Sequence, residues 1–434
     1  MNYRHAWSYL DRLQFFKIKL GLDSMNRFLA ALDEPHRQVA CVHIGGTNGK
    51  GSVAATLLSV LTAAGYRIGL YTSPHLSSVR ERFRIGDQFI SRNDFARLTE
   101  RIRSVLGDNQ ITYFEFTTTM AMLWFAEQQV DLALLEVGMG GRLDATNVVI
   151  PLVSVITNVS MDHEQYLGTT LEQVAGEKAG IIKPAIPVVS GVDDDVSRRV
   201  IGERCRRLQS PLHLLGRDFH GRGSSQRNSG WEYHGLRWHY SALPLAMRGG
   251  YQVDNASLAL ATVEILAGQG FSVDETAVRS GLEKTRWPGR LETFRTVNGS
   301  DSGHRFLLDG AHNPAGVHAL TRALEHEFTF SRLILVWAAM ADKDIRTTLA
   351  EVAPLAHRII LTRPESERSA SPASLRQCLP KRQQESAKCT DSVEDALELA
   401  VNEATERDLI CVAGSLYLVG KARKILLGDL VENP

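Results

Sequence analysis

The sequence has no long uncharged apolar run and no excess of charge of either sign. No stretch reaches the roughly 18 apolar residues that a membrane-spanning helix needs, and the opening MNYRHAWSYLDRL lacks the apolar core of a secretory signal. Lysine and arginine number 49, as do aspartate and glutamate, without a long run of one sign. We therefore expect a cytoplasmic protein that binds neither nucleic acid nor a membrane.

Cysteine is scarce and lacks a metal-binding or redox spacing. The five cysteines are scattered, odd in number and contain no C-x-x-C pair, which favours a reducing compartment and thiols that serve packing. At 434 residues the chain exceeds what one hydrophobic core usually supports, so two domains are expected.

The most informative stretch is VACVHIGGTNGKGS, residues 39–52. A short apolar strand at 39–42 leads into a glycine-rich turn, and a helix with apolar periodicity begins near Ser52. Backbone N–H groups and the helix dipole converge at such a junction and form an anion site, to which Lys50 adds a positive charge.

The stretch departs from the general P-loop pattern G-x-x-x-x-G-K-[ST]. Ile44 stands where the first glycine belongs, and Gly51 stands where the serine or threonine belongs. A glycine turn with a solvated lysine is the alternative interpretation. The strand–loop–helix context favours phosphate binding, but not a generic P-loop NTPase.

The variant loop GTNGKGS resembles the signature of the folylpolyglutamate synthase and dihydrofolate synthase family, a branch of the Mur-type ligases. Other matching stretches recur in family order almost to the C-terminus. The resemblance implies an α/β fold with two domains: a P-loop-type parallel-sheet ATPase domain that also binds pteroate, 1–290, and a Rossmann-like glutamate-ligase domain, 291–434. It assigns to ATP the whole loop: Gly46, Thr47, Asn48, Gly49, Lys50, Gly51 and Ser52.

The strand pattern agrees with this division. In the first part, strands are expected at 67–72, 83–85, 132–135 and 153–158, and a strand pair within 216–240. A Pro-Gly pair at 288–289 marks a hinge. After it, strands are expected at 305–308, 333–337, 358–361 and 409–412, with helices between them.

Three polar residues follow the ends of predicted strands in the first part: Ser73, Glu136 and His163. Strand ends in a parallel sheet face the ligand crevice, so a metal could be held there. Each also has an ordinary interpretation: Ser73 in a Ser-Pro turn, Glu136 paired with Arg142, and His163 as a structural histidine. The resemblance implies that the three bind Mg²⁺, with two ions at the site, although a histidine is an unusual ligand for an ion that prefers oxygen.

Further segments resemble those that hold the pterin and pteroate in the family. They are KLGLD near the N-terminus, YFEF at the start of a helix, and LDATN after Glu136. From the residues alone, Gly21 is a helix terminator and the YFEF aromatics are core. The residues that the resemblance assigns to this substrate are Leu20, Gly21, Leu22, Phe114, Glu115, Phe116, Leu143, Asp144 and Ala145.

The segment EKAGIIK, residues 177–183, resembles one whose first lysine is carbamylated in the family. By this resemblance Lys178 becomes an anionic oxygen ligand, whereas the residues alone are compatible with a surface lysine on a helix. Carbamylation requires partial burial, which would lower the pKa of the amine.

The remaining assignments come from the nucleotide and amino-acid segments of the family. Asn255, in a predicted helix, and Arg290, at the hinge, are expected to reach ATP, as is Asp309 of the DGAHNP motif. In the same motif His312 is expected to orient the amino acid, and Ser415 of GSLY to bind it.

Together these parts indicate an ADP-forming acid–amino-acid ligase. We expect it to use ATP and Mg²⁺ to join L-glutamate to dihydropteroate and to reduced folates through an acyl phosphate, as a monomer. Within enzymes, a monofunctional folylpolyglutamate synthase or, more remotely, a cell-wall Mur ligase stays open. A nucleotide-dependent switch without ligase chemistry is the alternative of another class, and adding substrates would leave its ATP turnover unchanged.

Overall fold

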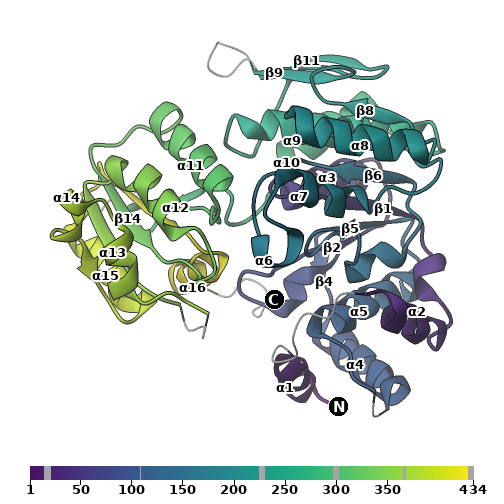
Figure 1. The fold of residues 1–434 in the computed structure, drawn as a ribbon, viewed down its shortest axis with the longest axis horizontal. Helices are drawn as coiled ribbons and strands as arrows, with labels where there is room; N and C mark the ends of the chain where they lie inside the picture. The colour runs from purple at the N-terminus through teal and green to yellow at the C-terminus, as the bar shows by residue number, and fades with distance from the viewer. Residues whose placement is uncertain (14–20, 108, 224–229, 297–302, 365–367, 429–434) are drawn as a thin grey trace. The chain divides into compact units, whose positions relative to one another are not determined.

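The computed structural model describes residues 1–13, 21–107, 109–223, 230–296, 303–364 and 368–428 (Figure 1). The chain forms two compact units. The first comprises residues 1–74, 79–246 and 252–285, and the second comprises 75–78, 247–251 and the chain from Arg286 onward.

An eight-stranded sheet forms the centre of the first unit, in the order β4-β3-β2-β5-β1-β6-β7-β8. Strands β2, β5, β1, β6, β7 and β8 are parallel to one another, and the β3–β4 hairpin adds an antiparallel edge. Their bounds are β1 (Cys41–Gly45), β2 (Ile68–Tyr71), β3 (Phe83–Ile85), β4 (Gln88–Phe89), β5 (Leu132–Glu136), β6 (Val153–Ile156), β7 (Val188–Ser190) and β8 (Leu212–Leu214). The central strands β1, β5 and β6 are buried throughout, which is why they read as continuous apolar runs.

Three long helices of this unit are apolar on nearly all sides: α3 (Lys50–Ala63), α5 (Tyr113–Glu127) and α9 (Tyr251–Ala267). A helix of that kind must be buried around its whole circumference. The other helices are α1 (Tyr3–Leu13), α2 (Asp23–Ala30), α4 (Arg92–Leu106), α6 (Glu164–Leu167), α7 (Leu171–Ala179), α8 (Asp195–Arg207) and α10 (Glu275–Lys284). Several begin at a side-chain cap, and α5 has a complete capping box between Thr112 and Glu115.

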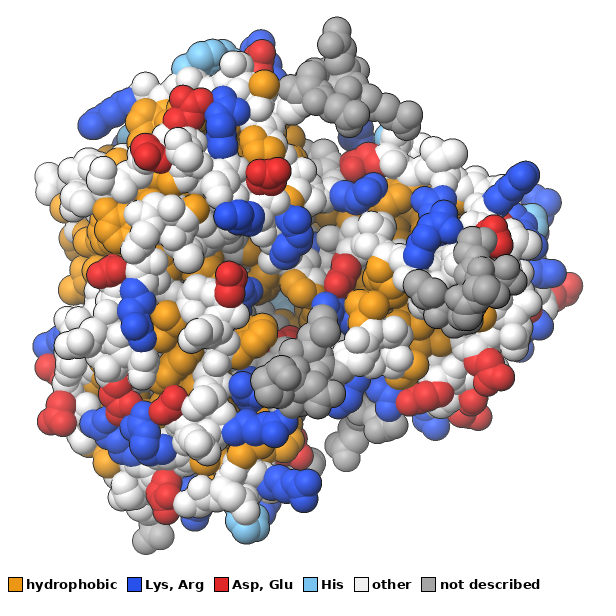
Figure 2. All heavy atoms as spheres, turned by 180° about the vertical axis from the view of Figure 1, so that it is seen from behind, with side chains coloured by type: hydrophobic (Ala, Val, Ile, Leu, Met, Phe, Trp, Pro, Cys, Tyr) orange, Lys and Arg blue, Asp and Glu red, His pale blue; other side chains and the backbone are white. Residues whose placement is uncertain are grey.

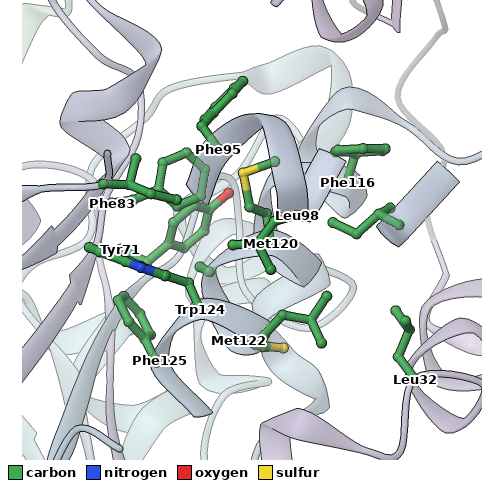
Figure 3. Packing of buried hydrophobic residues seen from close by; sticks show 14 of the residues in the cluster. Leu32, Tyr71, Phe83, Phe95, Leu98, Phe116, Met120, Met122, Trp124 and Phe125 are labelled. Atoms are coloured by element: carbon green, nitrogen blue, oxygen red, sulfur yellow. The ribbon is translucent and has the colours of Figure 1, made fainter. Parts of the chain in front are cut away.

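An aromatic and methionine-rich core lies among α1, α4, α5 and the edge of the sheet (Figure 3). Phe116 and Phe125 of α5 are fully buried in it, and the ring of Tyr9 packs 5.6 Å from that of Phe116. The aromatic residues of α5 that follow Phe114 are thus buried in this core.

The segment 216–240 was predicted as a strand pair, but the structure has three strands in this region. β9 (His220–Gly223), β10 (Trp231–His234) and β11 (His239–Leu243) form an antiparallel sheet, which Figure 1 shows beside α8 and α9. The buried carboxylate of Glu264 in α9 accepts hydrogen bonds from the Tyr233 hydroxyl and from the backbone N–H groups of Leu236, Arg237 and Trp238. It ties the β10–β11 turn to the helix.

The second unit has a six-stranded sheet in the order β12-β13-β17-β14-β15-β16, with an antiparallel edge strand β12. Its strands are β12 (Glu292–Arg295), β13 (Arg305–Leu308), β14 (Leu333–Trp337), β15 (Arg358–Leu361), β16 (Lys388–Cys389) and β17 (Leu409–Ala413). The helices are α11 (Pro314–His326), α12 (Ile345–Val352), α13 (Pro372–Cys378), α14 (Lys381–Gln384), α15 (Val393–Glu403) and α16 (Leu416–Leu427). The four strands predicted after the hinge all form, and the predicted α/β class is confirmed.

Within the described residues, no helix is both long enough and apolar enough to span a membrane. Figure 2 shows lysine and arginine side chains interspersed with aspartate and glutamate on the face that it draws.

Candidate active site

Four neighbouring parallel strands of the first unit carry the predicted site residues at their C-terminal ends. Ser73 follows β2, Glu136 ends β5, the glycine loop follows β1, and the segment that leads to His163 follows β6. These strands are adjacent in the order β2-β5-β1-β6. The sheet therefore gathers at one edge the residues that sequence reasoning took from separate motifs.

The glycine loop connects β1 directly to α3. Gly49 precedes the helix with φ of 83°, and Lys50 is its first residue. The Lys50 ammonium donates hydrogen bonds to the carbonyl oxygens of Gly46 and Thr47, both at 3.0 Å. A cation is thus held beside the loop, at a helix N-terminus whose dipole favours anions.

Residues 157–160, which follow β6, fix the conformation of this loop. The Thr47 N–H donates to the Asn158 carbonyl at 3.1 Å, and the Asn48 N–H donates to Asn158 Oδ1 at 2.9 Å. The Thr47 hydroxyl donates to the Ser160 carbonyl at 3.1 Å and accepts from the Ser160 N–H at 3.0 Å. The amides of Thr47 and Asn48 are therefore used to fold the loop.

Gly46 shows how closely this segment approaches. It has φ of 139°, and a Cβ placed on it would lie 1.9 Å from the Thr157 hydroxyl oxygen. Any side chain at this position would displace Thr157, so the glycine is required by the close approach as well as by its backbone angle.

Asn255 of α9 lies against the loop. A Cβ on Gly49 would be 2.5 Å from Asn255 Oδ1. The Asn255 amide donates to Gln252 Oε1 at 2.9 Å, and the Gln252 amide donates to the Ser52 hydroxyl at 3.3 Å. The structure thus brings Asn255 to the predicted ATP loop from about two hundred residues away in sequence, and adds Gln252 to the group.

The two oxygen-bearing residues of the predicted metal site lie together. Glu136 is 5% exposed, and its Oε2 accepts a hydrogen bond from the Ser73 backbone N–H at 3.1 Å. Arg142, the partner considered for Glu136, instead forms a 2.8 Å ion pair with Glu177.

His163 has a left-handed backbone conformation, with φ of 54°, immediately before α6. Its Nε2 lies 3.9 Å from Asp162 Oδ2. Among the residues with described positions, no group of three or more His, Cys, Asp or Glu side chains is placed to hold a metal ion.

Lys178 is buried, with 3% of its surface exposed, in the last turn of α7. Burial, reinforced by the nearby Lys50 charge and opposed by Asp162, lowers the pKa of its amine to about 7. The surface-lysine interpretation is therefore wrong, and the burial expected for this residue is confirmed.

The LDATN segment is folded around the buried carboxylate of Asp144. One oxygen accepts from the N–H groups of Gly138 and Met139, at 3.0 and 2.9 Å, and the other accepts from Thr146. Burial raises the pKa of Asp144, while these hydrogen bonds oppose the rise. Ala145 is buried and Leu143 is partly exposed, so Leu143 is the more accessible of the two.

The other residues assigned to the pterin substrate differ in how accessible they are. Phe114 is partly exposed, whereas Phe116 lies in the core. Glu115 caps α5 and accepts a 2.7 Å hydrogen bond from the Ser24 hydroxyl. Gly21 and Leu22 precede α2 and are partly exposed, and Leu20 lies outside the described residues. Substrate contact by this group stays a prediction.

In the second unit the predicted residues gather at the ends of β13 and β17. Asp309 accepts hydrogen bonds from the N–H groups of Leu291 and Ala311, at 2.8 and 2.9 Å, so its two oxygens hold the turn beside β13. Burial raises the pKa of Asp309, and the neighbouring Arg290 charge opposes the rise. A Cβ on Gly310 would lie 2.8 Å from Arg290 Nη1, which places that guanidinium beside the motif.

His312 and Ser415 complete this group. His312 Nδ1 lies 2.8 Å from the Gly310 carbonyl oxygen. Because that oxygen can only accept, Nδ1 carries the hydrogen and the tautomer is set. Ser415 is buried and caps α16 by accepting from the Tyr417 N–H at 3.2 Å.

Sequence reasoning missed the residues that support the site: Thr157, Asn158, Ser160, Gln252 and His43. The first three share the signal of polar residues directly after a buried strand. Gln252 and His43 carry no such signal, because Gln252 lies within a helix and His43 lies within a strand.

Comparison with known proteins adds to this geometry. The Mur ligase middle domain matches residues 44–263, and the Mur ligase glutamate ligase domain matches residues 289–416. The dihydrofolate synthase/folylpolyglutamate synthase of Bacillus subtilis is 32% identical over 98% of this chain and 99% of that protein.

The chain belongs to the folylpolyglutamate synthase and dihydrofolate synthase family of Mur ligases. Among solved structures of this family, Escherichia coli FolC in complex with DHPP and ADP has a TM-score of 0.87 and 31% identity, covering 98% of this chain and 97% of that one. The Yersinia pestis bifunctional enzyme, complexed with AMPPNP and a Mn ion, has a TM-score of 0.85 and 31% identity, covering 98% of each chain.

Proposed function

We propose that this protein ligates L-glutamate to dihydropteroate, giving dihydrofolate, and to reduced folates, giving polyglutamates, with ATP as the energy source. One observation carries the proposal. In a chain that is similar to bifunctional family members over nearly its whole length, the glycine loop, Glu136 and Ser73 lie at the ends of adjacent strands.

ATP binding is assigned to the first unit. The N-terminus of α3 and the Lys50 ammonium offer positive charge to phosphates, while the 157–160 segment holds the loop in shape. Asn255 lies against Gly49 of the same loop. In the second unit, we assign Arg290 and Asp309 to the nucleotide as well.

The donor atoms at the strand ends fit Mg²⁺. The Glu136 carboxylate and the adjacent Ser73 are oxygen donors, and Mg²⁺ in nucleotide sites takes one or two protein oxygens with phosphate and water completing its shell. Glu136, Ser73 and His163 would hold it, with two ions as the expected number. When bound, the metal supplies positive charge that offsets the charge developing on transferred phosphate.

We assign Lys178 as the site of carbamylation. Its buried amine has a pKa of about 7, so a large fraction is neutral at physiological pH and can attack CO₂. The new N–C bond forms as the nitrogen loses one proton to solvent, leaving an anionic carbamate. Incubation with ¹³C-bicarbonate is expected to give a carbamate resonance in the wild type that Lys178→Met lacks; a resonance equal in both proteins would contradict the assignment.

Glutamate binding is assigned to the second unit. The N-terminus of α16, capped by Ser415, offers N–H groups to a carboxylate. His312, whose tautomer is set by Gly310, orients the amino acid there.

The reaction proceeds in two steps. The substrate carboxylate attacks the γ-phosphorus of ATP, forming an acyl phosphate and releasing ADP; Lys50 offsets the charge of this loose transition state. The glutamate amine then attacks the acyl carbon, phosphate leaves, and the amine proton passes to solvent. Each turnover thus yields one amide, one ADP and one phosphate.

Phosphate release tests the function. ATP, Mg²⁺ and L-glutamate are supplied with dihydropteroate, with a reduced folate monoglutamate or with no acceptor, and Lys50→Ala serves as the blank. Turnover with both acceptors is the expected result. Turnover with the folate alone would indicate a monofunctional synthase, and an acceptor-independent rate would favour a nucleotide-dependent switch. Size measurement in the same preparation checks the expected monomer.

A further inference from the structure

The loop between β5 and β6 that contains Leu143 and Asp144 is held by side chains from several directions. Asp144 binds the N–H groups of Gly138 and Met139. The Asn147 amide donates to the carbonyls of Arg142 and Gly180, at 2.9 and 3.2 Å. These contacts hold the loop to itself and to the end of α7.

A further contact comes from the middle of β1. His43 is fully buried, and its Nε2 lies 2.8 Å from the Thr146 hydroxyl oxygen. The Thr146 hydroxyl itself donates to the Asp144 carboxylate. Since that hydroxyl spends its one hydrogen on Asp144, it must accept from His43, and Nε2 carries the histidine hydrogen.

The three side chains form a chain of hydrogen bonds that runs from β1 to the loop. His43 donates to Thr146, Thr146 donates to Asp144, and Asp144 binds the N–H groups of the 138–139 turn. That turn begins two residues after Glu136, and the C-terminal end of β1 leads into the glycine loop. A short chain of hydrogen bonds therefore connects the strand that precedes the ATP loop with the segment assigned to pteroate.

His43 is a costly choice for packing alone. Its Nδ1 is buried and has no hydrogen-bond partner among the described residues, so folding takes this nitrogen out of water without giving it a new partner. Burial, together with the Lys183 charge, lowers the pKa of its ring to about 3, so the ring stays neutral and its single hydrogen remains on Nε2 at physiological pH. An apolar residue would fill the same place without this cost.

We propose that His43 is a positioning residue that fixes the 138–146 loop for its acceptor substrate through Thr146 and Asp144. The proposal rests on the proposed function for the identity of that substrate. The position of the loop itself does not depend on it.

Two substitutions separate positioning from packing. His43→Gln keeps an N–H donor at a reach similar to Nε2, whereas His43→Leu fills the space without a donor. We expect His43→Leu to raise KM for dihydropteroate about 5- to 10-fold, the equivalent of one buried hydrogen bond. KM for ATP is expected to change less than twofold, and His43→Gln to recover most of the loss.

Amide hydrogen exchange provides a readout that needs no activity. In His43→Leu, the amides of Gly138 and Met139 are expected to exchange at least tenfold faster than in the wild type, and in His43→Gln at the wild-type rate. Thr99→Val is the matched control. It removes a buried threonine hydroxyl that bonds within α4, so it perturbs the buried interior of the same unit without touching this loop.

The outcomes separate the two proposals. Unchanged exchange at residues 138–139 in folded His43→Leu would overturn the positioning role, as would equal acceleration in Thr99→Val. If the wild type turns over neither acceptor, the proposed function fails, while the exchange result still decides the role of His43.

Discussion

Thr47→Val tests whether the 157–160 segment holds the glycine loop in its binding conformation. Valine has nearly the shape of threonine, so the substitution removes the hydroxyl and little else. The hydroxyl makes two hydrogen bonds, to the Ser160 carbonyl at 3.1 Å and from the Ser160 N–H at 3.0 Å. Both backbone groups of Ser160 lose that partner in the variant.

The size of the effect follows from these two bonds. Each contributes about 1 kcal/mol net, so the folded loop is destabilised by about 2 kcal/mol, less where water reaches the partly exposed Ser160. Since 1.4 kcal/mol corresponds to a factor of ten, KM for ATP is expected to rise by up to about 30-fold. The hydrogen bonds that the Thr47 and Asn48 N–H groups donate to Asn158 stay intact, so the protein is expected to fold.

The assay is phosphate release against ATP concentration, with thermal unfolding in parallel and Thr47→Ser as the control that keeps the hydroxyl. We expect Thr47→Ser to retain a KM within about threefold of the wild type. If Thr47→Val folds and its KM for ATP equals that of the wild type, these hydrogen bonds do not organise the loop, and the prediction is wrong.

Three further results are expected. Lys178→Met removes a buried amine whose pKa is lowered from 10.5 to about 7. Between about pH 7 and pH 10.5 the unfolded wild type holds a proton on Lys178 that the folded protein lacks, so the free energy of unfolding of the wild type rises with pH across that window. The Lys178→Met variant is therefore expected to be more stable than the wild type near neutral pH and to lose this advantage toward about pH 10. Urea midpoints at several pH values measure the difference. Glu264→Leu leaves one hydroxyl and three backbone N–H groups without their acceptor and should cost about 3 kcal/mol or more in urea unfolding, with Glu264→Gln costing less. In the second unit, burial raises the pKa of Asp408, but hydrogen bonds from Arg332 and Thr405 outweigh it and lower this pKa to about 2. The stabilisation that the ionised Asp408 gives is complete above about pH 4 and is expected to be lost as the pH falls from about 4 toward 2. Asp408→Asn should reduce this pH dependence.

The strands could be predicted because buried parallel strands carry continuous apolar sequences. β3, β13, β14 and β15 form at the predicted residues, and β5 and β17 extend one residue beyond theirs. The sheet in 220–243 was predicted less well, because its outward positions are polar and its third strand, β11, has only one buried residue.

The candidate site was predictable where polar or glycine residues directly follow the end of a predicted strand. The glycine loop, Glu136 and Ser73 were found in this way, and the tertiary structure places them on adjacent strands. Accessibility was less predictable. Phe114 and Phe116 lie two residues apart on one helix, yet one is partly exposed and the other is fully buried.

The amino-acid sequence by itself determined the α/β class, the glycine loop and which strands are followed by polar residues, because these depend on local periodicity and on backbone freedom at glycine. Only the tertiary structure decided which distant groups support them. Asn158, Gln252 and His43 act on residues more than a hundred positions away, and Lys178 owes its lowered pKa to burial. Burial and long-range hydrogen bonds arise from packing the whole chain, and no local pattern records them.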